Sequence, residues 1–142
     1  MSGLKLWPVV VGVLIDIAGS VGAGIAYFGA LAAMQAARGG PVDESLLTLG
    51  VPQLSMLAIV GLLFTATGGF VAAQMAKTRH LQHGIAVGIG SLLVGLLGEL
   101  TGGNADAPVW FDAISYLAVI PAAAFGGSLA GRGAPRASSG GS

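Results

Sequence analysis

The sequence has no cysteine and very few charged residues. Without cysteine the chain can form no disulfide, no thiolate metal site and no cysteine nucleophile. Charged residues make up 8% of its 142 residues, whereas roughly 25% is usual for soluble domains. A water-soluble protein of this size needs polar side chains to cover its surface. The shortage therefore indicates that most of the surface faces lipid.

The charges that are present balance to a formal net charge of zero, which argues against a nucleic acid partner. Hydrophobic residues make up 54% of the chain, and 25 further residues are glycine. The Gly-rich runs do not follow a strand and open a helix, as a phosphate-binding loop requires. No set of residues resembles a nucleophile with its base. We therefore expect no enzymatic activity and no cofactor, and the lipid bilayer as the main partner.

Four uncharged runs divide the chain, and they predict where it crosses the membrane, because charges are expensive in hydrocarbon. The runs hold 21, 32, 19 and 19 residues, and a spanning helix needs about 20. The prediction is an all-α membrane protein with one domain over residues 1–131 and a disordered cytoplasmic tail over 132–142. Its four transmembrane helices are expected at about 6–36, 53–76, 82–100 and 108–130.

The first predicted helix could be mistaken for a secretory signal, because Lys5 precedes its apolar stretch and Ala30-Leu31-Ala32 looks like a cleavage pattern. The apolar core of a signal is typically about 7–15 residues, which is shorter than this stretch. The stretch also contains Asp16. We therefore expect a retained helix.

The distribution of basic residues predicts the orientation. If the chain crosses four times, five of the six basic residues fall on one side, and Arg38 falls on the other with the acidic residues outside the spans. The positive-inside rule then places both termini in the cytoplasm, as expected for a multi-pass protein of a bacterial inner membrane. The five residues are Lys5, Lys77, Arg79, Arg132 and Arg136.

A stripe of small residues in the first helix recurs in the third. Gly12, Asp16, Gly19, Ala23 and Ala26 each have a counterpart 72 residues later, and residues 68–72 match 126–130 at an offset of 58. This pattern predicts two parallel copies of a helical hairpin, related by an axis along the membrane normal. The alternative is that matches arise by chance, because glycine and alanine are so common here. The counterparts are Gly84, Gly88, Ser91, Gly95 and Gly98.

Small residues in these stripes have a direct physical use. Lipid tails are as apolar as leucine, so helices associate where small residues allow their backbones to approach closely. We expect helix packing, rather than ligand binding, from five glycines: Gly12, Gly19, Gly84, Gly88 and Gly95.

Asp16 is the one charged residue expected near the middle of the membrane. It lies 11 residues after Lys5, so about 16 Å deeper along a helix and near the middle of a hydrocarbon core about 30 Å thick. An ionised carboxylate at that depth costs about 2.5–3.5 kcal/mol on insertion scales. Asp16 must therefore face protein or water. It belongs either to an ion, proton or small-solute site, or to a structural contact in which a protonated carboxyl bonds a neighbouring helix or subunit.

Other polar groups reach a similar depth when they are counted from the nearest basic residue. Pro121 adds to them, because it leaves the carbonyl of Leu117 without its usual helical donor. The candidate mid-membrane site therefore comprises this carbonyl together with Asp16, Ser20, Thr65, Thr67 and Ser91.

His80 and His83 are three residues apart in the second inner loop. The pair could touch one metal ion, but no third ligand is evident, so we expect no metal site and two solvated loop residues.

Residues 68–98 resemble a pattern found in small uncharacterised bacterial four-helix membrane proteins. In that pattern a helix ends in Gly-Gly-aromatic-x-Ala, a basic loop follows, and the next helix begins with His-Gly-x-x-x-Gly. Here the corresponding residues are Gly68 to Ala72 and His83 to Gly88. The resemblance covers about a fifth of the chain and implies a fold but no activity.

Two hypotheses for function follow. The leading one is a small non-enzymatic membrane protein that self-associates, forming a homo-oligomer, or serves as a subunit of a membrane complex, since four short helices enclose little room. The competing one is a small ion-coupled or proton-coupled transporter or channel that uses Asp16 at mid-membrane.

Overall fold

The computed structural model describes residues 3–39, 49–101 and 108–133, and within them every regular element is a helix. All four helices are long and apolar enough to cross a membrane, which indicates a multi-pass membrane protein. Their ends lie within two residues of the predicted ones. The predicted tail beyond Gly133 lies outside the described residues, as do 40–48 and 102–107. The helices are α1 (Leu6–Ala37), α2 (Val51–Ala76), α3 (His80–Leu100) and α4 (Val109–Arg132).

Prolines help to set the ends of these helices. Pro8 lies in the first turn of α1 and Pro52 in the first turn of α2. Backbone N–H groups in the first turn have no intrahelical partner, so the N–H that proline lacks costs no hydrogen bond there. Pro108 precedes the first residue of α4. Pro121 is different, because α4 continues through it without interruption. Membrane helices tolerate an interior proline where neighbouring groups compensate the freed carbonyl.

A turn of three residues joins α2 to α3. Lys77 has a φ of 59° and Arg79 a φ of 48°, so both adopt the left-handed conformation that favours glycine. The Lys77 amide donates to the carbonyl of Ala73 and closes the last turn of α2. The turn thus reverses the chain within a very short length, and it brings basic side chains to this end of the bundle.

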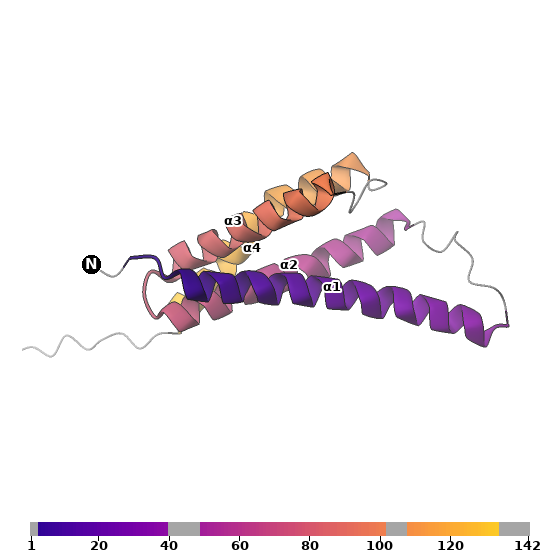
Figure 1. Ribbon diagram of the computed structural model, residues 1–142, viewed down its shortest axis with the longest axis horizontal. Coiled ribbons are helices and arrows are strands. Elements are labelled where there is room, and N and C mark those ends of the chain that lie inside the picture. The colour runs from indigo at the N-terminus through magenta and orange to yellow at the C-terminus, as the bar shows by residue number, and fades with distance from the viewer. Residues whose placement is uncertain (1–2, 40–48, 102–107, 134–142) are drawn as a thin grey trace, which may run out of the picture.

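The helices converge at one end of the molecule and separate toward the other (Figure 1). The α2–α3 end contains the start of α1, the turn between α2 and α3, and the end of α4. There α1 packs on α2, α3 packs on α4, and the most extensive contact joins α2 to α4. Toward the opposite end the α3–α4 pair diverges from α1. With 32 residues α1 is the longest helix, roughly 48 Å from end to end.

Small residues make up the core of the converging half. In α1, α3 and α4 every buried residue belongs to this half, and in α2 only Leu54 lies outside it. Among fully buried residues the two largest side chains are His83 and Val87. The backbones therefore approach closely, as expected when packing rather than apolar burial holds helices together in lipid. The small buried residues are Gly12, Gly68, Gly69, Ala72, Ala73, Ala76, Gly84, Gly88, Ala123, Gly126, Gly127 and Ala130.

Candidate functional site

A cavity of about 390 Å³ lies where the helices begin to separate, and all four helices line it. Most of its walls are aliphatic side chains such as Ile17, Leu62 and Val119. Its volume falls within the range of roughly 300–1,000 Å³ that is usual for small-molecule sites. Among the described residues, no Lys, Arg or His side chain contributes to the lining. The polar side chains in it are those of Asp16, Ser20, Thr65, Ser91, Ser115 and Tyr116.

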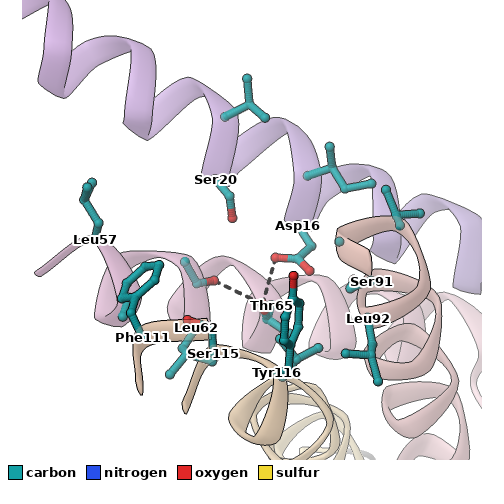
Figure 2. A pocket seen from close by; sticks show the side chains of 17 residues that line it. Asp16, Ser20, Leu57, Leu62, Thr65, Ser91, Leu92, Phe111, Ser115 and Tyr116 are labelled. Atoms are coloured by element: carbon teal, nitrogen blue, oxygen red, sulfur yellow. Dashed lines mark hydrogen bonds between the residues drawn. The ribbon is translucent and has the colours of Figure 1, made fainter. Parts of the chain in front are cut away.

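Asp16 is the acid of this cavity. Its side chain is only 6% exposed, and it points from α1 toward Thr65 of α2 (Figure 2). Within the described part of the chain, its carboxyl group has one hydrogen-bond partner, the Thr65 hydroxyl, and no basic residue pairs with it. A carboxyl that is buried with a single neutral partner is costly in its ionised form unless a further group or water compensates it.

Thr65 is the direct partner of Asp16. Its hydroxyl lies 2.8 Å from Oδ1 of Asp16 and 3.1 Å from the carbonyl oxygen of Gly61, one turn earlier in α2. Thr65 is 3% exposed, so its hydroxyl is held between these two acceptors rather than by solvent.

Ser91 presents a second buried polar group to the cavity. The residue is 9% exposed, and its hydroxyl oxygen has no hydrogen-bond partner among the described residues. A buried hydroxyl without a partner loses free energy comparable to a hydrogen bond. Ser91 is therefore able to bond a polar atom that enters the cavity. Ser20, one turn beyond Asp16 in α1, also points into this space (Figure 2).

Tyr116 adds an aromatic wall and a polar link between two helices. Its hydroxyl donates to the carboxylate of Glu99 and thereby joins α4 to α3 beside the cavity. Tyr116 and Ser115 line the cavity although neither was among the predicted site residues. Tyr116 lies only four residues after Asp112, where an aromatic side chain fits the pattern of an interfacial residue. The sequence spacing does not identify Tyr116 as a cavity residue, because its place depends on how α4 packs against α3.

The structure brings together Asp16, Ser20, Thr65 and Ser91, but it places Thr67 elsewhere. Thr67 is exposed, and its hydroxyl donates to the Leu63 carbonyl 2.8 Å away. Thr67 follows Thr65 by two positions, so the two side chains lie about 200° apart around α2. Leu117, whose carbonyl Pro121 leaves free, does not line the cavity either.

The expected packing glycines lie at helix contacts, with one exception. An added Cβ at Gly12 would meet the Gly68 carbonyl at 2.7 Å, and one at Gly19 would overlap the ring of Phe64. At Gly84 an added Cβ would lie 2.5 Å from the Ala123 carbonyl, and at Gly88 it would lie 2.7 Å from Cα of Ile120. Gly95 differs, because it is exposed and lines the cavity, with Tyr116 at an ordinary 3.4 Å.

The sequence predicted that both histidines are solvated loop residues, and the structure differs. Both belong to α3, and His83 is fully buried at the α2–α3 end. The Lys5 amide donates to Nε2 of His83 at 3.1 Å, so Nε2 must be unprotonated. The proton is then on Nδ1, which lies 3.1 Å from the Arg79 carbonyl and donates to it. The expectation for His83 was wrong because the first turn of α3 packs against the residues that precede α1, where the ring accepts a hydrogen bond from the Lys5 amide.

Lys5 completes the same contact. Its ammonium group donates to the Ala76 carbonyl at the end of α2, where a positive charge is favoured. Within the described residues no group of three or more His, Cys, Asp or Glu side chains could hold a metal ion. His83 and Lys5 thus tie the start of α1 to α2 and α3 at this end of the bundle.

Comparison of the chain with protein-family models, with curated proteins and with solved structures gives no match.

Proposed function

We propose that this protein is a small, non-enzymatic transporter that moves protons, or a solute coupled to them, through the cavity that contains Asp16. The observation that supports this proposal is the buried carboxyl of Asp16 at a four-helix cavity, with one hydroxyl partner and no balancing positive charge. Ionisable residues at such a depth are costly, and membrane proteins characteristically use them in ion or proton pathways.

The shape of the bundle is consistent with this role. Close packing of glycine and alanine closes the α2–α3 end. The hydrogen bonds of Lys5 to His83 and to the Ala76 carbonyl further hold the helices together there. The cavity lies on the other side of this packing, where the helices diverge (Figure 1). A solute or water could therefore approach Asp16 from the diverging end. Transport then requires the packed end to open, or a second conformation in which the helices converge at the other end.

The test is proton flux into liposomes containing the purified protein. A potassium gradient with valinomycin supplies the driving force, and an enclosed pH-sensitive dye reports the flux. Asp16→Asn keeps the size and hydrogen-bonding capacity of the side chain but removes its titration. We expect this variant to lose the flux.

The matched control is Asp112→Asn, which removes an acid from the first turn of α4, outside the cavity lining. This control should retain the flux of the unchanged protein. Flux that persists in Asp16→Asn contradicts the role of Asp16.

A second candidate function is self-association, or service as a subunit of a membrane complex. The observation that favours it is the outer part of α3, where six consecutive residues, Leu93 to Gly98, are exposed. Lipid or another protein must cover exposed apolar side chains such as Leu93, Leu96 and Leu97. Because the chain has no cysteine, Leu97→Cys can form a disulfide only with another chain. A cross-linked dimer in membranes supports self-association, and a protein that stays monomeric at all lipid ratios contradicts it.

We further propose that α1–α2 and α3–α4 are copies of one hairpin, and that both termini face the cytoplasm of a bacterial inner membrane. The sequence match motivates the repeat, and α2 and α4 also make a reciprocal contact. Gly69 packs against the carbonyl of Ala123, and Gly126 packs against that of Ala66. Gly126 lies 57 residues after Gly69, and Ala123 lies 57 residues after Ala66. The sequence match between the two helices has an offset of 58. The basic residues at the α2–α3 end support the orientation.

A further inference from the structure

The hydroxyl of Thr65 lies within hydrogen-bond distance of two acceptors but has only one hydrogen. Oδ1 of Asp16 is 2.8 Å away, and the carbonyl oxygen of Gly61 is 3.1 Å away. A threonine hydroxyl can donate once and accept through its lone pairs. Both contacts cannot be donations from Thr65 at the same time, so the geometry admits two hydrogen-bond patterns.

In the first pattern Asp16 is ionised. The Thr65 hydroxyl then donates to Oδ1, which is a charge-assisted hydrogen bond and stronger than a neutral one. The Gly61 carbonyl needs no further donor, because it lies within the continuous helix α2 and accepts a backbone bond there.

In the second pattern Asp16 is protonated on Oδ1. The carboxyl now donates to the oxygen of Thr65, and the Thr65 hydrogen turns to the Gly61 carbonyl. Every donor again has an acceptor. Only a rotation about the Thr65 Cβ–Oγ1 bond separates the two patterns, so no helix has to move when the proton arrives or leaves.

We propose that Thr65 is a positioning residue that allows Asp16 to exchange a proton with the cavity, and that the ion handled at this site is H⁺. This inference rests on the proposed transport function and specifies its ion. A hydronium ion in the cavity gives its proton to Oδ1, so that one O–H bond breaks, another forms, and water is left. The reverse step returns the proton to water.

Ser91 supplies an independent reason to expect a polar molecule at this place. Its buried hydroxyl lines the same cavity and has no partner among the described residues. Water is small enough to bond such a hydroxyl and to carry protons to Asp16. A dehydrated metal ion fits less well, since hard cations such as Ca²⁺ take about 6–8 oxygen ligands and Asp16 is the one carboxylate in the lining.

The experiment compares three substitutions in the liposome assay and by infrared difference spectroscopy. Thr65→Val keeps the shape of the side chain but removes the hydroxyl, and Thr65→Ser restores it. Thr67→Val is the matched control, because the structure places the Thr67 hydroxyl outside the cavity and on the Leu63 carbonyl. The C=O band of protonated Asp16 is identified as the one that Asp16→Asn removes.

We expect Thr65→Val to lower the proton flux about tenfold or more, since the lost hydrogen bond involves a charged group. The C=O band of Asp16 should shift, because the carboxyl loses its partner. Thr65→Ser should recover both the flux and the band, and Thr67→Val should change neither.

Three results would overturn the proposal. One is a Thr65→Val protein with unchanged flux and an unchanged band. Another is an equal loss in Thr65→Val and Thr67→Val, which indicates general disruption of α2. The third is a Thr65→Ser protein that recovers neither readout. If Asp16→Asn abolishes the flux and Thr65→Val does not, transport by Asp16 stands and the role of Thr65 is wrong. If Asp16→Asn changes nothing, the proposed function itself fails.

Discussion

The closest approach between α2 and α4 gives a sharp prediction about stability. A methyl group added at Gly126 would overlap the carbonyl oxygen of Ala66, and it would lie 2.7 Å from the Ala66 carbonyl carbon and 3.0 Å from the Phe70 amide nitrogen. All three atoms belong to the backbone. No side chain can rotate away to make room, so in Gly126→Ala the two helices must move apart.

The size of the effect follows from a comparison with a glycine that has free space. Gly22 lies in the interior of α1, and an added Cβ there has no atom within 4 Å. Replacing either glycine by alanine favours the helical state by up to about 1 kcal/mol, and this gain cancels in the comparison. What remains is the overpacking at Gly126, typically about 1–3 kcal/mol. The difference amounts to about 5- to 150-fold in the folding equilibrium constant.

The assay is reversible unfolding in mixed micelles as the mole fraction of SDS rises, followed by the loss of helical circular dichroism. Gly126→Ala should unfold at a clearly lower SDS fraction than Gly22→Ala, and Gly22→Ala should match or exceed the unchanged protein. If the two variants agree to within about 0.5 kcal/mol, which is the usual range for a surface change, the contact between α2 and α4 is not as close as described.

Two further predictions concern the buried His83 and the orientation of the protein in the membrane. His83→Ala should lower the free energy of unfolding by about 2–5 kcal/mol, as truncation of a large buried side chain does, whereas His80→Ala, at a partly exposed position, should cost far less in the same SDS titration. The proposed topology can be mapped with single cysteines, since the chain has none of its own. In intact cells a membrane-impermeant maleimide should label Thr101→Cys at the end of α3 but not Thr78→Cys in the turn, and the opposite result would invert the orientation.

The number, length and boundaries of the helices could be predicted because they depend on a property that is local in sequence. A charged side chain cannot lie in hydrocarbon at low cost, so long uncharged runs mark the spans whatever their neighbours are. The depth of Asp16 follows in the same way, from the constant rise of a helix. The close packing of Gly12, Gly84 and Gly88 was predictable too, since in lipid only small residues allow backbones to meet.

Membership of the site was only partly predictable, because depth gives the level of a residue along the membrane but not the direction in which it faces. Thr65 and Thr67 lie at nearly the same depth, yet only Thr65 reaches Asp16. Tyr116 belongs to the cavity because α4 packs against α3 so that the Tyr116 hydroxyl reaches Glu99.

The sequence by itself determined that this chain is a helical membrane protein with one acid inside its first long apolar helix, because the free energy of placing charge in lipid depends on residue type and spacing alone. The tertiary structure decided which groups Asp16 meets, that a cavity opens beside it, and that the ring of His83 lies between helices rather than in solvent. Those outcomes depend on the rotation and crossing of four helices, and that arrangement is fixed by contacts between residues that lie far apart in the chain.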